Sequence, residues 1–154
     1  MNERVIRYDE VLLWKAEALI QLDRINDALI PINKIRARAA NSTGLLHYSN
    51  GNPVLNYNIE PYKPGVNCNW TKDFAWKALQ WETRLEMAGE GRRFFDLMRW
   101  GILEKTMNDY FAVEKNRRAY YAPAHFTAGR DEFLPIPQNQ MNWAKGNYTQ
   151  NAGY

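Results

Sequence analysis

The sequence WETRLEMAGEGRRFFDLMRWG, residues 81–101, decides the fold of this chain. It places charged residues between large apolar ones on both sides of a short Gly-Glu-Gly break. Helical periodicity predicts a helix that begins near Thr71 or Asp73, either of which can cap it, and continues to about Ala88. A glycine then stops it, and a short apolar helix follows that ends at Gly101. The segment therefore predicts two helices joined by a tight turn.

Apolar side chains recur at helical spacing in the first of these helices, which predicts that they face a core: Phe74, Ala78, Trp81 and Leu85. The second helix is strongly apolar, with Phe94, Phe95, Leu97, Met98 and Trp100. If the indole of Trp81 or of Trp100 is buried, we expect its removal to cost about 3–5 kcal/mol.

Carboxylates recur every four residues along the first helix and its exit, at Glu82, Glu86 and Glu90. Paired carboxylates serve glycosidases as acid and base or nucleophile, but this spacing is also common on charged helix faces. Neighbouring arginines would hold the carboxylates ionised, which favours salt bridges over general-acid catalysis. The residues expected to form this structural junction are Trp81, Glu82, Arg84, Glu86, Glu90, Gly91, Arg93, Asp96, Arg99 and Trp100, with Arg92 as a further cation.

Residues 7–40 predict a helical hairpin, because apolar positions share one face in each half. They are Leu12, Ala16 and Leu19 in the first half, and Ala28, Ile32, Ile35 and Ala39 in the second. Asn26 or Asp27 can cap the second helix, and Pro31 is expected near its first turn. The pair has the length of a tetratricopeptide repeat. A further helix is expected from about Leu103 to Tyr120.

Two irregular regions complete the chain. Residues 41–70 are rich in Asn, Gly, Pro and Tyr, and a loop of this length is typically functional or disordered. Aromatic faces stack on sugar rings and Asn amides bond to hydroxyls, so the candidate ligand-binding residues are Tyr48, Asn52, Tyr57, Tyr62 and Trp70. Core packing and partner contact remain alternatives for them. Residues 122–154 contain prolines and glycines that forbid long helices, and we expect an extended strap around residues 133–138 to lie over the helices.

Composition excludes several classes of function. The net charge of +3 comes from mixed charges without a long basic run, which disfavours nucleic acid. One cysteine, Cys68, and two distant histidines, His47 and His125, offer no disulfide and no metal-ligand spacing, so we expect neither metal nor cofactor. No nucleophile elbow or phosphate-binding loop is present, and no apolar run spans a bilayer.

Five segments in order resemble the SusD/RagB family of outer-membrane nutrient-binding lipoproteins. They are RYDEVLLWKAEAL (7–19), INKIRARA (32–39), residues 81–101, LPIPQ (134–138) and QNAGY (150–154). Many members have Glu-Gly-His-Arg where this chain has Arg92 in place of the histidine. That exchange of one basic residue for another does not threaten the fold.

The resemblance implies an all-α fold of tetratricopeptide-like helix pairs with a long irregular loop and an extended C-terminal strap. It implies that residues 1–154 form a single C-terminal domain of a longer protein whose N-terminal half and lipoprotein signal are not present here. It also implies a non-catalytic component that binds glycans or other nutrients, works with a SusC-like TonB-dependent transporter, and is surface-exposed on the outer membrane. Membrane association would come only through a lipid anchor, and the fragment itself would be soluble. The alternative is a helical-repeat module for protein–protein interaction without its own ligand.

Overall fold

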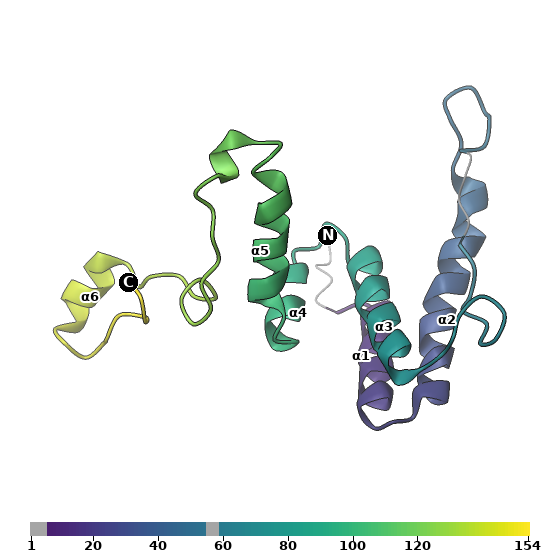
Figure 1. Cartoon of the computed structure of the whole chain (residues 1–154), viewed down its shortest axis with the longest axis horizontal. Coiled ribbons are helices and arrows are strands. Elements are labelled where there is room, and N and C mark those ends of the chain that lie inside the picture. The colour runs from purple at the N-terminus through teal and green to yellow at the C-terminus, as the bar shows by residue number, and fades with distance from the viewer. Residues whose placement is uncertain (1–5, 55–58) are drawn as a thin grey trace. The chain divides into compact units, whose positions relative to one another are not determined.

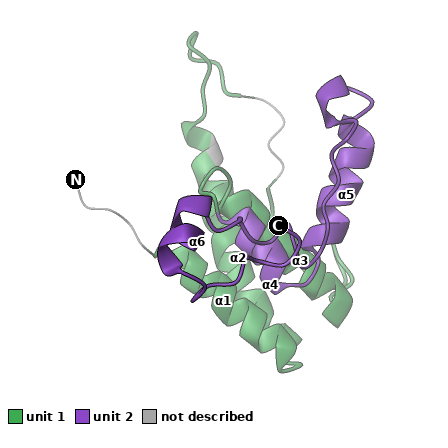
Figure 2. Cartoon of the chain, turned by 90° about the vertical axis from the view of Figure 1, so that its left-hand side faces the viewer, with its two compact units in different colours: residues 1–91 green, residues 92–154 purple. Residues whose placement is uncertain are grey.

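The computed structural model describes residues 6–54 and 59–154, and the chain divides into two compact units, residues 1–91 and 92–154 (Figure 2). The first unit contains α1 (Tyr8–Gln21), α2 (Ile25–Ser42), the 3-10 turn η1 (Thr43–Leu45) and α3 (Lys72–Glu86). Each of its three α-helices contacts the other two (Figure 1). The predicted helix pair and third helix are confirmed.

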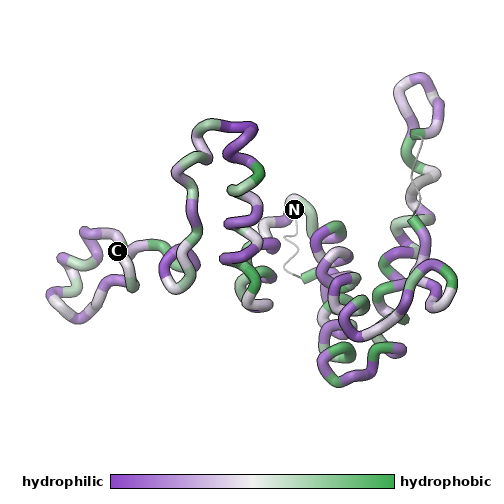
Figure 3. Tube along the Cα trace, in the orientation of Figure 1, coloured by the Kyte–Doolittle hydropathy of each residue, from purple (hydrophilic) through white to green (hydrophobic). Residues whose placement is uncertain are grey.

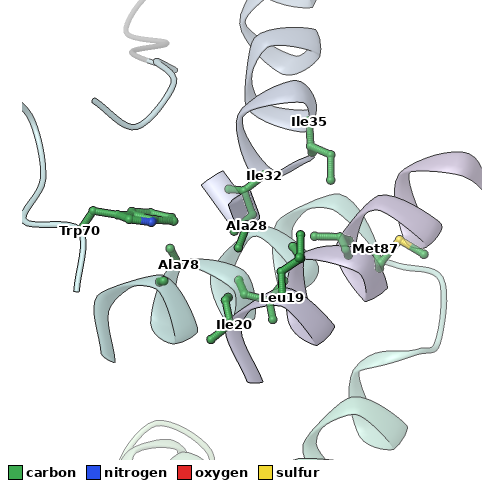
Figure 4. Close-up of a cluster of buried hydrophobic side chains, with 12 residues drawn as sticks. Leu19, Ile20, Ala28, Ile32, Ile35, Trp70, Ala78 and Met87 are labelled. Atoms are coloured by element: carbon green, nitrogen blue, oxygen red, sulfur yellow. The ribbon is translucent and has the colours of Figure 1, made fainter. Parts of the chain in front are cut away.

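The core of the first unit lies between these three helices (Figure 4). Its largest fully buried side chains are Ile20, Ile32 and Leu79, one from each helix. Full burial of such a side chain contributes roughly 1.5–3 kcal/mol. Alanines at the remaining contacts, among them Ala16 and Ala28, leave no exposed surface and let the helix backbones approach closely.

The turn between α1 and α2 closes with two backbone hydrogen bonds, from Asp23 N–H to Ile20 and from Arg24 N–H to Leu19. Asp23 takes a left-handed conformation with φ of 59°, where glycine is the usual residue. Because this turn is so short, α2 already begins at Ile25. The predicted cap at Asn26 or Asp27 is therefore wrong, and Pro31 lies inside α2 rather than near its first turn.

Thr71 caps α3, since its hydroxyl accepts a hydrogen bond from the Phe74 N–H, as one of the two predicted starts requires. The inward face of α3 differs from the prediction. Trp81 is 54% exposed and Leu85 is also exposed, whereas the buried face carries Ala75, Ala78, Leu79, Glu82 and Thr83. The core face of α3 thus includes a carboxylate and small residues, and the large Trp81 and Leu85 side chains lie outside it.

The second unit contains α4 (Arg93–Arg99), α5 (Leu103–Glu114), the 3-10 turn η2 (Ala119–Tyr121) and α6 (Gln138–Ala144). Gly101 ends α4 with φ of 68°, as predicted. Helix α5 stops at Glu114, not at Tyr120, because the next amides bond in tight turns and Glu114 pairs with Arg117 and Arg118. Three buried residues form this unit's core: Leu97, Leu103 and Phe126.

Irregular segments in both units are attached by a recurring device, which we call an amide clasp. In a clasp, one side-chain carboxamide accepts from the N–H and donates to the carbonyl of the same distant residue. Asn33 clasps Tyr62, Asn108 clasps Phe126 and Gln150 clasps Ile136, with distances between 2.7 and 2.9 Å. Each clasp reproduces the two hydrogen bonds of a β-ladder without a strand.

The predicted strap is held to the end of the chain. The Gln150 clasp fixes Ile136. Asn151 donates a hydrogen bond to the Leu134 carbonyl at 2.7 Å. The Tyr154 hydroxyl donates one to the Phe133 carbonyl at 3.0 Å. These bonds give the closing QNAGY sequence a structural purpose. That the strap lies over the helical bundle stays a prediction.

The fold is all-α, as predicted: apart from two isolated β-bridges, the described residues form helices, turns and irregular chain. Polar and apolar residues alternate in short stretches along the helices (Figure 3). Among the described residues, none of the helices combines the length and hydropathy that crossing a bilayer requires. The tetratricopeptide-like geometry and the single-domain organisation stay predictions.

Candidate functional site

The first part of the 41–70 loop is a small hairpin that projects past the end of α2 (Figure 1). His47 and Pro53 form an antiparallel bridge, and the Tyr48 N–H donates to the Asn52 carbonyl at 2.8 Å. Gly51 closes the turn with φ of 81°, a conformation that favours glycine. Tyr48 is 56% exposed and Asn52 is also exposed, so the hairpin presents two of the predicted ligand-binding residues to solvent.

Tyr62, a third predicted residue, is half-buried against α2 and α3. The Asn33 clasp fixes its backbone, the Arg36 guanidinium lies 4.2 Å from its ring centroid, and its hydroxyl donates to Glu82 at 3.2 Å. Burial and the Glu82 charge raise the pKa of Tyr62 to about 12. The phenol therefore stays neutral in any physiological setting and acts as a hydrogen-bond donor.

Trp70, the fourth, belongs to the core. It is 8% exposed, and its indole N–H donates to the Ile25 carbonyl at 2.9 Å. Its ring lies 5.5 Å from Tyr62 and 5.8 Å from Phe74, between ring centroids. Little of Trp70 is available to a ligand, so its contribution is to support Tyr62. The fifth predicted residue, Tyr57, lies outside the described residues.

A hollow of about 240 Å³ adjoins Tyr62, and its lining consists of Arg36, Glu60, Tyr62 and Asn67. Another of about 560 Å³ opens at the start of α1, where its lining includes Ile6, Tyr8, Leu12, Lys34, Ile35 and Arg38. Sequence reasoning missed both, because each joins residues that are far apart in the chain. The only local signal was that α1 carries apolar residues, such as Tyr8 and Val11, outside its core face.

The glutamates on α3 and in the turn after it are neutralised by arginines from α2 and from the residue that precedes α1. Arg36 pairs with the buried Glu82, Arg38 with Glu86 at 2.5 Å, and Arg7 with Glu90 at 2.9 Å. Two of the neighbours expected in this role, Arg84 and Arg99, make other contacts. Arg84 lies over the Trp81 ring at 4.9 Å, and Arg99 pairs with Asp96 and lies over Trp100.

Asp9, at the start of α1, and Glu86, at the end of α3, influence each other's pKa. Burial, together with the Asp9 hydrogen bond, raises the pKa of Glu86, contrary to the expectation that arginines would keep it low. Burial alone would raise the pKa of Asp9, but the hydrogen bond from Glu86 and the charge of Arg7 lower it. A raised pKa suits a general acid, yet the Glu86 side chain is only 8% exposed beneath Arg7 and Arg38. This arrangement is a shielded structural cluster.

The SusD family model matches residues 1–154, the whole length of the sequence. The chain belongs to the SusD/RagB family. A comparison with curated protein sequences finds no significant match. The SusD family binds glycans and other nutrients without catalysis, and its members are lipoproteins of the outer-membrane surface that pair with SusC-like transporters.

The structure gives physical reasons for the SusD family landmarks of this chain. The INKIRARA segment supplies Asn33, Arg36 and Arg38, which clasp Tyr62 and pair with the α3 glutamates. Gly91 takes a φ of 74° in the turn before α4, where a side chain would be strained. Asn33, Arg36, Arg38 and Gly91 of these landmarks thus hold the scaffold together. The exposed positions of the 41–70 loop remain the candidate ligand contacts.

Proposed function

We propose that this chain forms the helical scaffold of a non-catalytic glycan-binding protein in a SusC-like, TonB-dependent uptake complex at the outer-membrane surface. Family membership supports the broad role. The observation that carries the ligand contact is the 41–70 loop, which holds Tyr48 and Asn52 exposed on a hairpin and Tyr62 beside a hollow. Tyr57 is included in this set only because the sequence of the loop predicts it as a ligand contact.

The chemistry of these residues fits neutral sugars. An exposed tyrosine ring stacks on the apolar face of a pyranose, and carboxamides both donate to and accept from hydroxyls. The Asn67 carboxamide beside the hollow is already committed, since it donates to the Pro61 carbonyl and accepts from the Lys63 N–H. Asn52 at the hairpin tip therefore supplies the amide that contacts the ligand.

Calorimetry of the chain against plant, fungal and host oligosaccharides tests this proposal. We expect Tyr48→Ala to weaken binding of the best ligand roughly tenfold, the effect of losing one stacking contact. Tyr148→Ala is the matched control, because that side chain is equally exposed at 55% but lies in the other unit. Absence of binding across the whole panel would refute the proposal, and equal losses in both variants would refute the assignment to the loop.

The exposed apolar face of α1 favours a second role, contact with the transporter. Val11 and Trp14 are exposed on α1, and Leu22 is exposed directly after it. A helix with apolar residues on several faces normally packs on more than one side. We expect Trp14→Glu to abolish co-purification with the SusC-like transporter while glycan binding remains. If the complex survives this change, the face serves another purpose.

A further inference from the structure

Four aromatic rings gather where α5 ends and η2 begins in the second unit. Tyr121 lies at the centre, with ring centroids 5.9 Å from Tyr110, 5.7 Å from Phe111 and 4.6 Å from Tyr120. Phe111 packs on the buried cluster of this unit and so anchors the group. The outermost ring, Tyr120, is 67% exposed, although its inner neighbours hold it in place.

A basic turn adjoins this aromatic group. Residues 114–118 read Glu-Lys-Asn-Arg-Arg, so three cations and one carboxylate leave a local net charge of +2. The buried Glu114 carboxylate lies 3.2 Å from the Arg117 guanidinium and 3.7 Å from that of Arg118, and its carbonyl accepts both of their backbone N–H groups. Glu114 thus fixes the turn but does not cancel its charge.

Arg118 and Tyr120 belong to one tight turn, because Arg118 directly precedes η2 and its carbonyl accepts the Tyr121 N–H at 3.0 Å. One turn therefore carries an exposed aromatic ring and a largely exposed, permanently charged donor. The ring suits the apolar face of a pyranose, and a guanidinium with free N–H groups pairs with a carboxylate through two parallel hydrogen bonds. A ligand that satisfies both groups carries a carboxylate on a sugar ring.

We propose that Tyr120 and Arg118 form a second glycan contact, selective for a uronic acid residue. The proposal rests on the proposed function only in taking a glycan as ligand. Its site, its residues and its preference for negative charge are separate from those of the 41–70 loop. A neutral sugar would use the ring alone, and the +2 charge of the turn would add nothing to its binding.

Binding of oligogalacturonate and of a neutral malto-oligosaccharide of equal length to the whole chain tests this proposal. We expect oligogalacturonate to bind more tightly, and Tyr120→Ala to weaken it about tenfold. Arg118→Gln should remove most of the preference for the acidic sugar but keep the weak binding of the neutral one. Tyr8→Ala is the matched control, because Tyr8 is 65% exposed and also lies beside a cation, Lys34.

Several outcomes would overturn the proposal. The first is equal binding of acidic and neutral sugars, and the second is oligogalacturonate binding that survives Tyr120→Ala. The third is displacement of oligogalacturonate by a single-stranded oligonucleotide at lower concentration, which would make the site a nucleic-acid contact. Tyr48→Ala separates this proposal from the preceding one, since it should leave oligogalacturonate binding at Tyr120 unchanged. Loss in the Tyr48 variant alone would reject the Tyr120 site and keep the loop site.

Discussion

The two units of the chain are stabilised in different ways. Among its described residues, the first unit buries twelve apolar ones around three helices, and ion pairs join those helices. The second buries three and relies on amide clasps at Phe126 and Ile136. Apolar burial is the larger source of stability, so we expect the second unit to open at a lower free energy than the first. The first unit is therefore expected to be the more stable of the two.

Breaking the buried ion pair of the first unit should have the largest effect. Arg36→Met leaves the Glu82 carboxylate buried without its guanidinium, which costs about 3–5 kcal/mol. Urea unfolding measures this loss in the transition of the first unit. The control is Arg24→Met, whose exposed pair with Asp27 should contribute less than about 1 kcal/mol. Equal losses in the two variants would mean that burial of Glu82 is energetically unimportant.

The clasps allow the same change in both units. Asn33→Asp and Asn108→Asp each replace the N–H donor by an oxygen that faces a carbonyl, at a cost of about 1–3 kcal/mol. Hydrogen exchange should show the wider loss of protection in the second unit, whose core is smaller. Asn139→Asp is the control, because its side-chain hydrogen bond uses only the acceptor oxygen. Equal losses of protection in the two units would contradict the expectation that the second unit is the less stable one.

Acidity should act on the first unit through Glu86. Its folded pKa is raised, so the stability gained from its protonated form is complete below the unfolded value near 4.5 and is lost as pH rises through the folded pKa. Asp9 acts oppositely, since its lowered pKa gives stability that is lost as pH falls. The melting temperature of Glu86→Gln minus that of the wild type should therefore increase as pH rises from about 4 to 7. A Glu86→Gln profile that runs parallel to that of the wild type would refute the raised pKa of Glu86.

The smallest effect is expected at Trp81. Its indole is 54% exposed, so Trp81→Ala should cost less than about 1 kcal/mol in thermal unfolding. In the same unit, Trp70→Ala removes a buried indole and should cost about 3–5 kcal/mol. A large loss at Trp81 would indicate that another part of the protein covers this residue in solution.

Local signals in the sequence located most helix ends. The Thr71 cap and the Gly101 stop depend on residues within one helical turn, so both could be predicted. The burial of Glu82 and the exposure of Trp81 could not be, because they depend on which face α3 turns toward its neighbours. The partners of Glu82 and Glu86 lie 46 and 48 residues away, beyond the reach of any spacing rule. The composition of the 41–70 loop predicted Tyr62 as a ligand contact. The clasp of its backbone by Asn33 could be identified only in the folded structure.

The amide clasps also bear on how this architecture can diversify. A clasp binds the peptide group of one residue and ignores the side chain, so chain on either side can lengthen or shorten without moving the anchored point. The entropic cost of closing a loop rises slowly with its length, by roughly 0.6 kcal/mol for each doubling. With Tyr62 held by Asn33, the hairpin that carries Tyr48 is free to accept insertions, deletions and new residues. A scaffold of this kind can acquire a new specificity by changes in one projecting segment, while its helices remain unaltered.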